Sequence, residues 1–207
     1  MPKPTFFRLP REKHDRLLAS AWAEFTSERF SDVSINRIIQ RARIPRGSFY
    51  QYFSDKEDLF NHLVDTLRGA CRDIVSAALD EAKGDLFSMA LFTYDRAIRE
   101  DGSVAAPLEN GIRLLQLNRN MDAAQLLTGR MDVDGALGEL FAHSDLSALR
   151  RTDEAFLRGA VQLLLSSVAC AMSETLRDST QRGAVRAQLA VKTEIIRRGC
   201  EKEAAPV

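Results

Sequence analysis

Residues 34–53 read SINRIIQRARIPRGSFYQYF, two short segments of helical pattern separated by a proline. In the first segment, apolar residues recur at positions i, i+3, i+4 and i+7, which is one face of a helix. These residues are Ile35, Ile38, Ile39 and Ala42. Pro45 disfavours helical backbone at the residue before it and is tolerated in the first turn of a helix. The sequence therefore predicts a helix, a tight turn and a second helix that begins at about residue 45.

The second predicted helix has an inward and an outward face. Phe49 and Phe53 are four residues apart and share the inner face. Gly47, Ser48 and Gln51 then point the opposite way. A small, polar outer face can approach the edges of bases, and flanking Arg and Tyr side chains can hydrogen-bond phosphates. Two helices of this kind are a known way to hold one helix in the major groove of DNA.

Residues 11–63 resemble the TetR/AcrR family of bacterial transcriptional regulators. The resemblance rests on Phe25 and Phe30, on the segment GSFYQYF at 47–53 and on the segment SDKEDLF at 54–60. It implies an N-terminal three-helix helix-turn-helix domain and a larger C-terminal helical bundle for effector binding and dimerisation.

The same resemblance implies DNA contacts residue by residue. Four positions match those that usually touch phosphates: Ser34, Tyr50, Tyr52 and Lys56. Four match positions that face bases: Arg46, Gly47, Ser48 and Gln51. Gln and Arg side chains have the hydrogen-bonding geometry for adenine and guanine edges, respectively.

Arg43 departs from the family pattern, because most members have Gly in this turn. The backbone there often takes φ > 0, where a non-Gly residue costs on the order of 1 kcal/mol. We therefore expect either an altered turn or a strained Arg43 that contacts phosphate in return.

Charge is unevenly distributed along this chain of 207 residues, whose net charge is zero. Residues 1–54 hold ten Lys and Arg against five Asp and Glu, a net charge of +5, so the remainder carries −5. A basic head on an acidic body is typical of a polyanion-binding domain joined to a domain with another role. We predict a helix-turn-helix DNA-binding domain at 1–54 and an effector-binding and dimerisation domain at 55–207.

The rest of the chain shows helical patterns and no strand-like alternation, so the predicted fold is all-α. Residues 1–10 are Pro-rich and basic and are expected to form a flexible arm. Ser54 with Glu57 three residues on is a good helix start, and the long helix that follows is expected to bridge the two domains. Helices are expected at about 11–28, 55–83, 85–100, 107–117, 122–131, 152–179 and 182–200.

Apolar residues of the C-terminal half have two possible uses beside core packing, which is the simpler explanation for any one of them. The family resemblance implies a small-molecule pocket between the helices of residues 85–175, and large, flexible apolar side chains suit such a pocket. The candidates are Phe87, Leu91, Phe92, Leu114, Met121 and Phe156. The last two helices have broad apolar faces that suit a four-helix dimer interface, two helices from each subunit. The candidates there are Ala160, Leu164, Ala171, Leu189 and Ile196.

Patterns that indicate catalysis or metal binding are weak. The three histidines are scattered, and no metalloprotease motif, phosphate loop or nucleophile elbow is present. The three cysteines lack CxxC spacing, and their odd number favours a reducing cytoplasm. The longest apolar-rich run, 159–172, is shorter than the ~20 residues that span a bilayer. We expect no catalytic residue, cofactor, metal or membrane partner.

Together these observations predict a cytoplasmic homodimer that binds a pseudo-palindromic duplex DNA operator. It would regulate transcription, as a repressor that a small apolar effector releases from its operator. One alternative is a TetR-like DNA-binding protein with no small-molecule effector, in an architectural or division-control role, which a closed C-terminal core would favour. The other is a helical-bundle enzyme, which would need convergent ionisable residues in a deep pocket.

Overall fold

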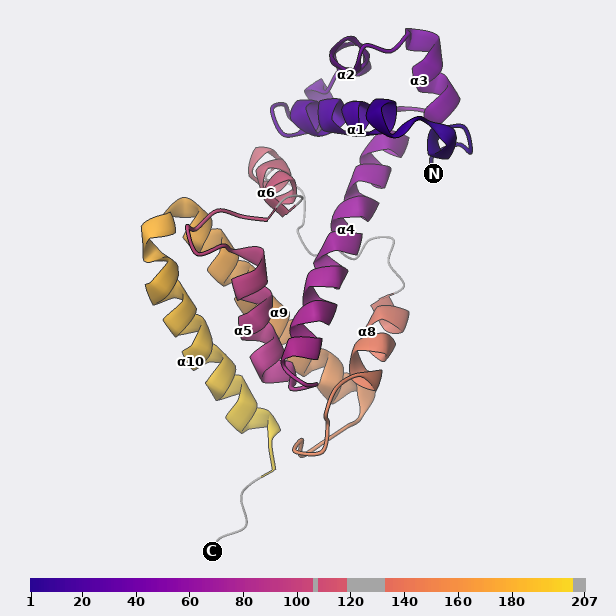
Figure 1. Ribbon diagram of the computed structural model, residues 1–207. Helices are drawn as coiled ribbons and strands as arrows, with labels where there is room; N and C mark the ends of the chain where they lie inside the picture. Colours follow the sequence, from indigo (N-terminus) through magenta and orange to yellow (C-terminus); the bar gives the residue numbers. More distant parts are fainter. Residues whose placement is uncertain (106–107, 119–132, 203–207) are drawn as a thin grey trace, which may run out of the picture. The chain divides into compact units, whose positions relative to one another are not determined.

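The computed structural model of the protein describes residues 1–105, 108–118 and 133–202 (Figure 1). Within these ranges the regular elements are nine α-helices and three short 3-10 helices, with no strand, so the all-α prediction is confirmed. The α-helices are α1 (Arg11–Phe25), α2 (Ile35–Ala42), α3 (Arg46–Tyr52), α4 (Lys56–Glu81), α5 (Leu86–Ala97), α6 (Leu108–Leu117), α8 (Val133–Ala142), α9 (Glu154–Arg177) and α10 (Arg182–Cys200).

The chain divides into two compact units, and the division falls within α4. Unit 1 contains residues 1–70 and α6, and unit 2 contains residues 71–105 and 133–202. The boundary at 54/55 drawn from the sequence separates the basic head from α4. That boundary stays a prediction of where the DNA-binding domain ends. It differs from the boundary between the two compact units, which lies between residues 70 and 71.

Unit 1 has a core to which each of its first four helices contributes. Leu17 of α1, Ile38 of α2, Phe49 of α3 and Leu59 of α4 are all fully buried. Burial of this kind of side chain contributes about 1.5–3 kcal/mol each, which is what holds three short helices together.

Helix α6 joins unit 1 by a close approach to α4. A Cβ atom added at Gly111 would lie 2.6 Å from Leu67 Cδ2, so no larger residue fits there without movement of that side chain. At the end of α6, the Asn118 side-chain oxygen accepts a hydrogen bond of 2.9 Å from the Phe30 backbone N–H. Phe30 lies in the segment that leads into α2, so α6 is tied directly to the helix-turn-helix region.

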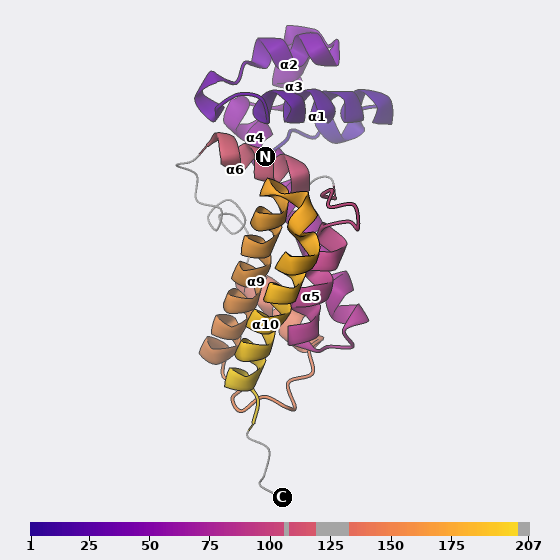
Figure 2. The ribbon, with the colours of Figure 1, turned by 90° about the vertical axis from the view of Figure 1, so that its left-hand side faces the viewer.

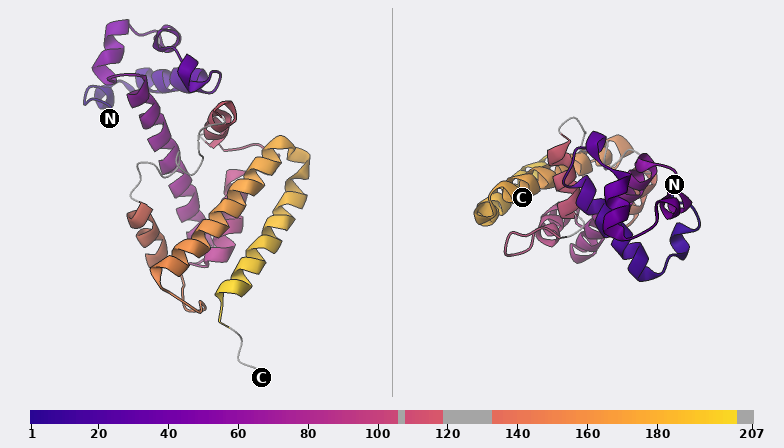
Figure 3. Two further views of the ribbon diagram at one scale, coloured as in Figure 1. Left: turned by 180° about the vertical axis from the view of Figure 1, so that it is seen from behind. Right: turned by 90° about the horizontal axis from the view of Figure 1, so that it is seen from above.

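Unit 2 is built on three helices, α5, α9 and α10, that pack against one another. Helices α9 and α10 lie side by side (Figure 2) and are joined by the 3-10 turn Ser179–Gln181 (Figure 3). Met89, Tyr94 and Leu164 are fully buried between the three helices. The Tyr94 hydroxyl lies 2.6 Å from Thr175 Oγ1, so this buried phenol has the hydrogen-bond partner that it requires.

Two ion pairs fix the register of α5 against α10. Arg186 contacts Asp95 at 2.6 Å, and Arg197 contacts Asp85 at 2.5 Å. Burial by itself would raise the pKa of Asp85, but hydrogen bonds from Ser88 and Arg197 outweigh it and hold the pKa below its ordinary value. Asp85 is also the N-cap of α5, so one carboxylate serves both the helix start and the contact with α10.

Several local expectations change. Residues 1–10 are ordered and include a 3-10 helix at Phe6–Arg8, whereas a flexible arm was expected. The apolar contacts of Phe6, which is fully buried, are the physical reason. Residues 133–142, which had no clear pattern, form α8. The helix expected at 122–131 lies outside the described residues.

Helix α9 has 24 residues, whereas the apolar-rich run in the sequence covers only residues 159–172. The most apolar 18-residue stretch of this helix has a mean hydropathy of 1.6, so the helix is long and apolar enough to cross a membrane. One face of α9 is buried in the core of unit 2 by Leu157, Ala160, Val161, Leu164, Val168, Ala171 and Thr175. A core helix can have the same length and composition as a membrane span, and we assign α9 to the core because this face is buried in unit 2.

Candidate nucleic-acid interface

Helices α2 and α3 form the predicted helix–turn–helix. On α2 the inward face is buried at Ile38, Ile39 and Ala42, while Ile35 at its first turn is half-buried. On α3 the inward residue Phe49 is fully buried, and so is Phe53 directly after the helix. The apolar spacing in the sequence therefore identified the faces of both helices.

The turn between them contains Arg43 in the left-handed region, with φ 53° and ψ 47°. The Arg43 N–H donates to the Gln40 carbonyl at 3.2 Å, and the Ile44 N–H donates to the Ile39 carbonyl at 3.1 Å. This pair of bonds is the Schellman arrangement that ends many helices, usually with Gly at the left-handed position. The turn thus keeps the usual geometry, and Arg43 takes the backbone strain that a Gly would avoid.

A side chain from α1 closes the same turn. Arg16 Nε donates a hydrogen bond of 2.8 Å to the carbonyl of Ala42, the last residue of α2. That carbonyl has no partner inside its own helix. Arg16 therefore attaches the end of α2 to α1, a role that no pattern in the sequence indicated.

The start of α2 depends on a buried carboxylate. Glu24 of α1, with 2% of its side chain exposed, accepts hydrogen bonds from the Ser34 N–H at 3.1 Å and from Arg37 Nε at 2.5 Å. The hydrogen bond with Glu24 is the main reason that the pKa of Arg37 is raised. Ser34 is the N-cap residue as expected, but its hydroxyl makes no capping bond; its backbone N–H contacts Glu24 instead.

Three arginines surround the turn on its outer side: Arg41, Arg43 and Arg46. All are exposed. None of their guanidinium groups has a hydrogen-bond or ion-pair partner among the residues that the structure describes. Unpaired guanidinium groups gathered on one turn suit a phosphate backbone, which attracts cations and releases its counterions on contact.

The outward face of α3 is accessible, as a reader of major-groove edges requires. Gly47 and Gln51 are exposed, Ser48 and Tyr52 are half-buried, and Tyr50 is 42% exposed. A Cβ atom added at Gly47 would meet nothing within 4 Å. Packing inside the protein therefore does not explain the Gly, whereas close approach of another molecule would.

Lys56 has a different environment from the arginines of the turn. Its ammonium donates to the carbonyls of Phe30 and Ser31, at 2.8 and 3.2 Å, and lies 4.8 Å from the centre of the Phe30 ring. In this structure Lys56 holds the segment before α2. The phosphate contact implied by the family resemblance stays a prediction for this residue.

The geometry defines a class of protein: a helix-turn-helix domain that presents an accessible short helix beside a cationic turn. A family model described as "Bacterial regulatory proteins, tetR family" matches residues 17–63. Residues 17–63, which include the helix-turn-helix, are therefore similar to the corresponding region of TetR-family regulators.

Two curated relatives are similar to parts of this chain. The transcriptional regulator AcuR of Cereibacter sphaeroides is 29% identical over 111 residues, which is 53% of this chain and 49% of that protein. The uncharacterized HTH-type transcriptional regulator YdgC of Bacillus subtilis is 33% identical over 70 residues, 34% of this chain and 36% of that protein. The matches thus span half or less of these curated relatives.

The fold extends the likeness beyond the helix-turn-helix. The crystal structure of a TetR-family transcriptional regulator from Streptomyces coelicolor matches with a TM-score of 0.60 at 20% identity, covering 92% of this chain and 97% of that one. At this identity the match concerns the fold alone.

The described residues among those proposed for a ligand pocket belong to both compact units. Phe87 lines a hollow of about 220 Å³ in unit 2, whose other walls include Asp85, Arg197 and Glu201. Leu91, Phe92 and Phe156 are half-buried in unit 2 and do not line that hollow. Leu114 is fully buried in unit 1, and Met121 lies outside the described residues.

The residues proposed for a dimer interface are mostly buried inside the chain itself. Ala160, Leu164, Ala171 and Leu189 are at most 5% exposed, and Ile196 is half-buried. These side chains pack within unit 2 and offer little surface to a partner. The large exposed apolar residues of the two helices are instead Leu163, Val191 and Ile195.

Replacement of Arg43 by Gly is expected to raise the free energy of unfolding by about 0.5–1 kcal/mol, because Gly adopts φ > 0 without strain. Chemical denaturation measures the change. Arg43→Ala is the matched control, since it removes the charge and keeps the strain. A loss of stability in Arg43→Gly would contradict the strained turn.

Gly47→Ala is expected to stabilise the free protein by roughly 0.5–1 kcal/mol, because the added methyl enters open space and Ala is a better helix former. The same change should weaken DNA binding if base edges approach this position. Gly69→Ala in α4, where a Cβ also meets nothing within 4 Å, is the control for the stability gain alone. Equal DNA affinities of the two variants would argue against close approach at Gly47.

Proposed function

We propose that the protein is a sequence-specific DNA-binding transcriptional regulator, a repressor that a small ligand releases from its operator. The observation that carries the DNA-binding part is the group of unpaired guanidinium groups on the turn next to the exposed face of α3. The similarity of residues 17–63 to TetR-family regulators supports the regulatory part.

The proposed contacts divide by chemistry. Arg43, Ser34, Tyr50 and Tyr52 contact phosphates and set the orientation of the domain. Arg46, Gly47, Ser48 and Gln51 face bases in the major groove, where Gln51 suits adenine and Arg46 suits guanine. Lys56 would have to leave its backbone carbonyls in order to reach phosphate, so we give it a secondary role.

A single domain of this size reads few base pairs, and a twofold dimer on a pseudo-palindromic operator doubles the contacts. We place the dimer contact on the exposed side of α9 and α10. On α10, Val191 and Ile195 are 60% and 66% exposed, and on α9, Leu163 is 58% exposed. Exposed apolar residues gathered on neighbouring helices are typical of a surface that a partner covers.

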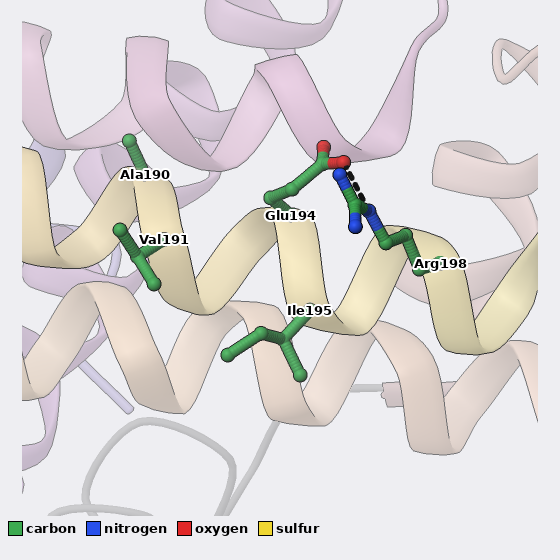
Figure 4. A pocket seen from close by; sticks show the side chains of 5 residues that line it. All are labelled: Ala190, Val191, Glu194, Ile195 and Arg198. Carbon is green, nitrogen blue, oxygen red and sulfur yellow. Dashed lines mark hydrogen bonds and ion pairs between the residues drawn. The ribbon is translucent and has the colours of Figure 1, made fainter.

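The α10 part of this surface is hollowed. Figure 4 shows the side chains of Ala190, Val191, Glu194, Ile195 and Arg198, all on α10. They line an open, mostly apolar hollow of about 450 Å³ on the surface of this helix. Arg198 Nε donates to Glu194 at 2.7 Å across its edge, which leaves the apolar side chains to meet the partner. An isologous contact would place the same hollow of each copy near the twofold axis.

For the ligand we propose an apolar small molecule bound in unit 2. Leu91 and Phe92 of α5 and Phe156 of α9 keep part of their apolar surface accessible within the described part of that unit. A ligand can regulate DNA binding only if it binds the DNA-competent and the DNA-incompetent states with different affinities. A thermal-shift screen of apolar compounds, followed by operator titration with each hit, tests this. Hits that never change operator affinity would favour the architectural alternative.

The DNA contacts predict the behaviour of Gln51→Ala. Selection from a random-sequence duplex library should yield a pseudo-palindromic site for the wild-type protein. Gln51→Ala should then lose about 1–3 kcal/mol of discrimination at one base pair in each half-site, while its salt dependence stays the same. Gln181→Ala, at an exposed position of unit 2, is the control. Unchanged discrimination in Gln51→Ala would remove this residue from the reading face.

The dimer contact predicts that Leu163→Glu and Ile195→Glu each convert the dimer to monomers, because a buried unpaired carboxylate is unfavourable in an apolar contact. Light scattering measures the mass, and circular dichroism checks that each variant is folded. Lys192→Glu, exposed on the same helix but outside the hollow, should stay dimeric. A wild-type protein that is monomeric at micromolar concentration would contradict the proposal.

A further inference from the structure

The last turn of helix α3 has backbone carbonyls without hydrogen-bond partners inside the helix. Helix α3 contains seven residues, and a helix of this length is not stable in isolation. The last four carbonyls of any α-helix lack partners within the helix. The Phe53 N–H donates to the Phe49 carbonyl at 2.9 Å, which leaves the carbonyls of Tyr50, Gln51 and Tyr52. These three residues carry side chains of the proposed DNA contact.

The N-terminal arm, residues 1–8, donates to all three of these carbonyls. The Lys3 N–H donates to the Tyr52 carbonyl at 2.8 Å, and the Lys3 ammonium donates to the Tyr50 carbonyl at 2.8 Å. The Thr5 hydroxyl donates to the Gln51 carbonyl. The ammonium also lies at the negative end of the α3 dipole, where a cation is favourable.

Phe6 anchors the arm in the core of unit 1. Its side chain is fully buried. Its ring centre lies 4.8 Å from that of Phe53, 4.8 Å from that of His14 on α1 and 5.0 Å from that of His62 on α4. Burial lowers the pKa of His62, which favours the neutral ring beside Phe6. The residue next to Thr5 is therefore held by contacts with α1, α4 and the residue that ends α3.

We propose that the N-terminal arm positions the recognition helix: Lys3 and Thr5 hold the last turn of α3 in the geometry that its side chains need to read DNA. Both are positioning residues, because they act through the α3 backbone and do not touch the bases. This inference rests on the proposed DNA-binding function, which the cationic turn supports independently of the arm.

Amide hydrogen exchange of the free protein tests the positioning without DNA. Thr5→Val and Lys3→Met each remove a side-chain donor and keep much of the side-chain volume. Each should speed exchange of the amides at 50–53 by about 2- to 10-fold, the range that one hydrogen bond contributes, and leave the amides of α1 unchanged. Thr5→Ser and Lys3→Arg keep a donor and should restore protection. Arg8→Ala, at an exposed position of the same arm, should have no effect.

Unchanged exchange at 50–53 in both donor variants would overturn the proposal. So would an equal increase in α1, because that would indicate general loss of stability. The exchange experiment tests the role of the arm without DNA. Failure of the proposed DNA-binding function would be seen separately, because the wild-type protein would then select no duplex from a library.

DNA binding then distinguishes positioning from direct contact. With a duplex selected by the wild-type protein, Thr5→Val should reduce discrimination between that duplex and its single-base-pair variants by about 2- to 10-fold. Binding to unrelated duplexes should fall less than binding to the selected duplex, because the turn arginines are untouched and only the phosphate contacts of Tyr50 and Tyr52 share the loosened turn. An equal loss of affinity on all duplexes would overturn positioning and indicate that the arm contacts the DNA backbone itself.

Discussion

The constraint on which the candidate interface depends is that short helices cannot satisfy their own ends. Helices α2 and α3 contain eight and seven residues, and each relies on other segments for its terminal groups. Arg16 closes the end of α2, Glu24 anchors the residue before its start, and the N-terminal arm closes the end of α3. A reading helix needs a fixed orientation, and here hydrogen bonds from distant parts of unit 1 provide it.

This constraint divides the basic residues of the N-terminal head into two groups. Some donate to groups of the protein itself: Lys3 and Arg16 donate to backbone carbonyls, as does Lys56 directly after the head, and Arg37 donates to Glu24. The arginines on the turn have no such partner among the described residues and are available to an external polyanion. The net charge of +5 at 1–54 therefore does not indicate which of its cations are available.

In unit 2 the apolar faces of the helices are covered mainly by other helices of the same chain. The apolar faces of α9 and α10 were assigned to a dimer from the sequence, yet Leu164 and Leu189 on those faces are buried against helices of the same chain. In a three-helix core, each helix buries one apolar face against the other two helices of the same chain, and that face is then not available to a partner. Residues on the opposite side, such as Val191 and Ile195, are the ones left exposed. Periodicity identifies a face but does not identify what packs on it.

The sequence by itself determined the helical fold and the two faces of the helix-turn-helix, because apolar spacing and proline act over a few residues. At Arg43 it left an altered turn and a strained residue as alternatives, and the structure shows the strained residue. Only the tertiary structure decided the partners of Glu24, the backbone carbonyls that Lys56 contacts, the burial of Phe6 in the N-terminal arm and the assignment of Leu114 and Phe87 to different units. Each of these depends on contacts between residues far apart in the chain. Local patterns carry no information about which distant donor will meet an unsatisfied carbonyl.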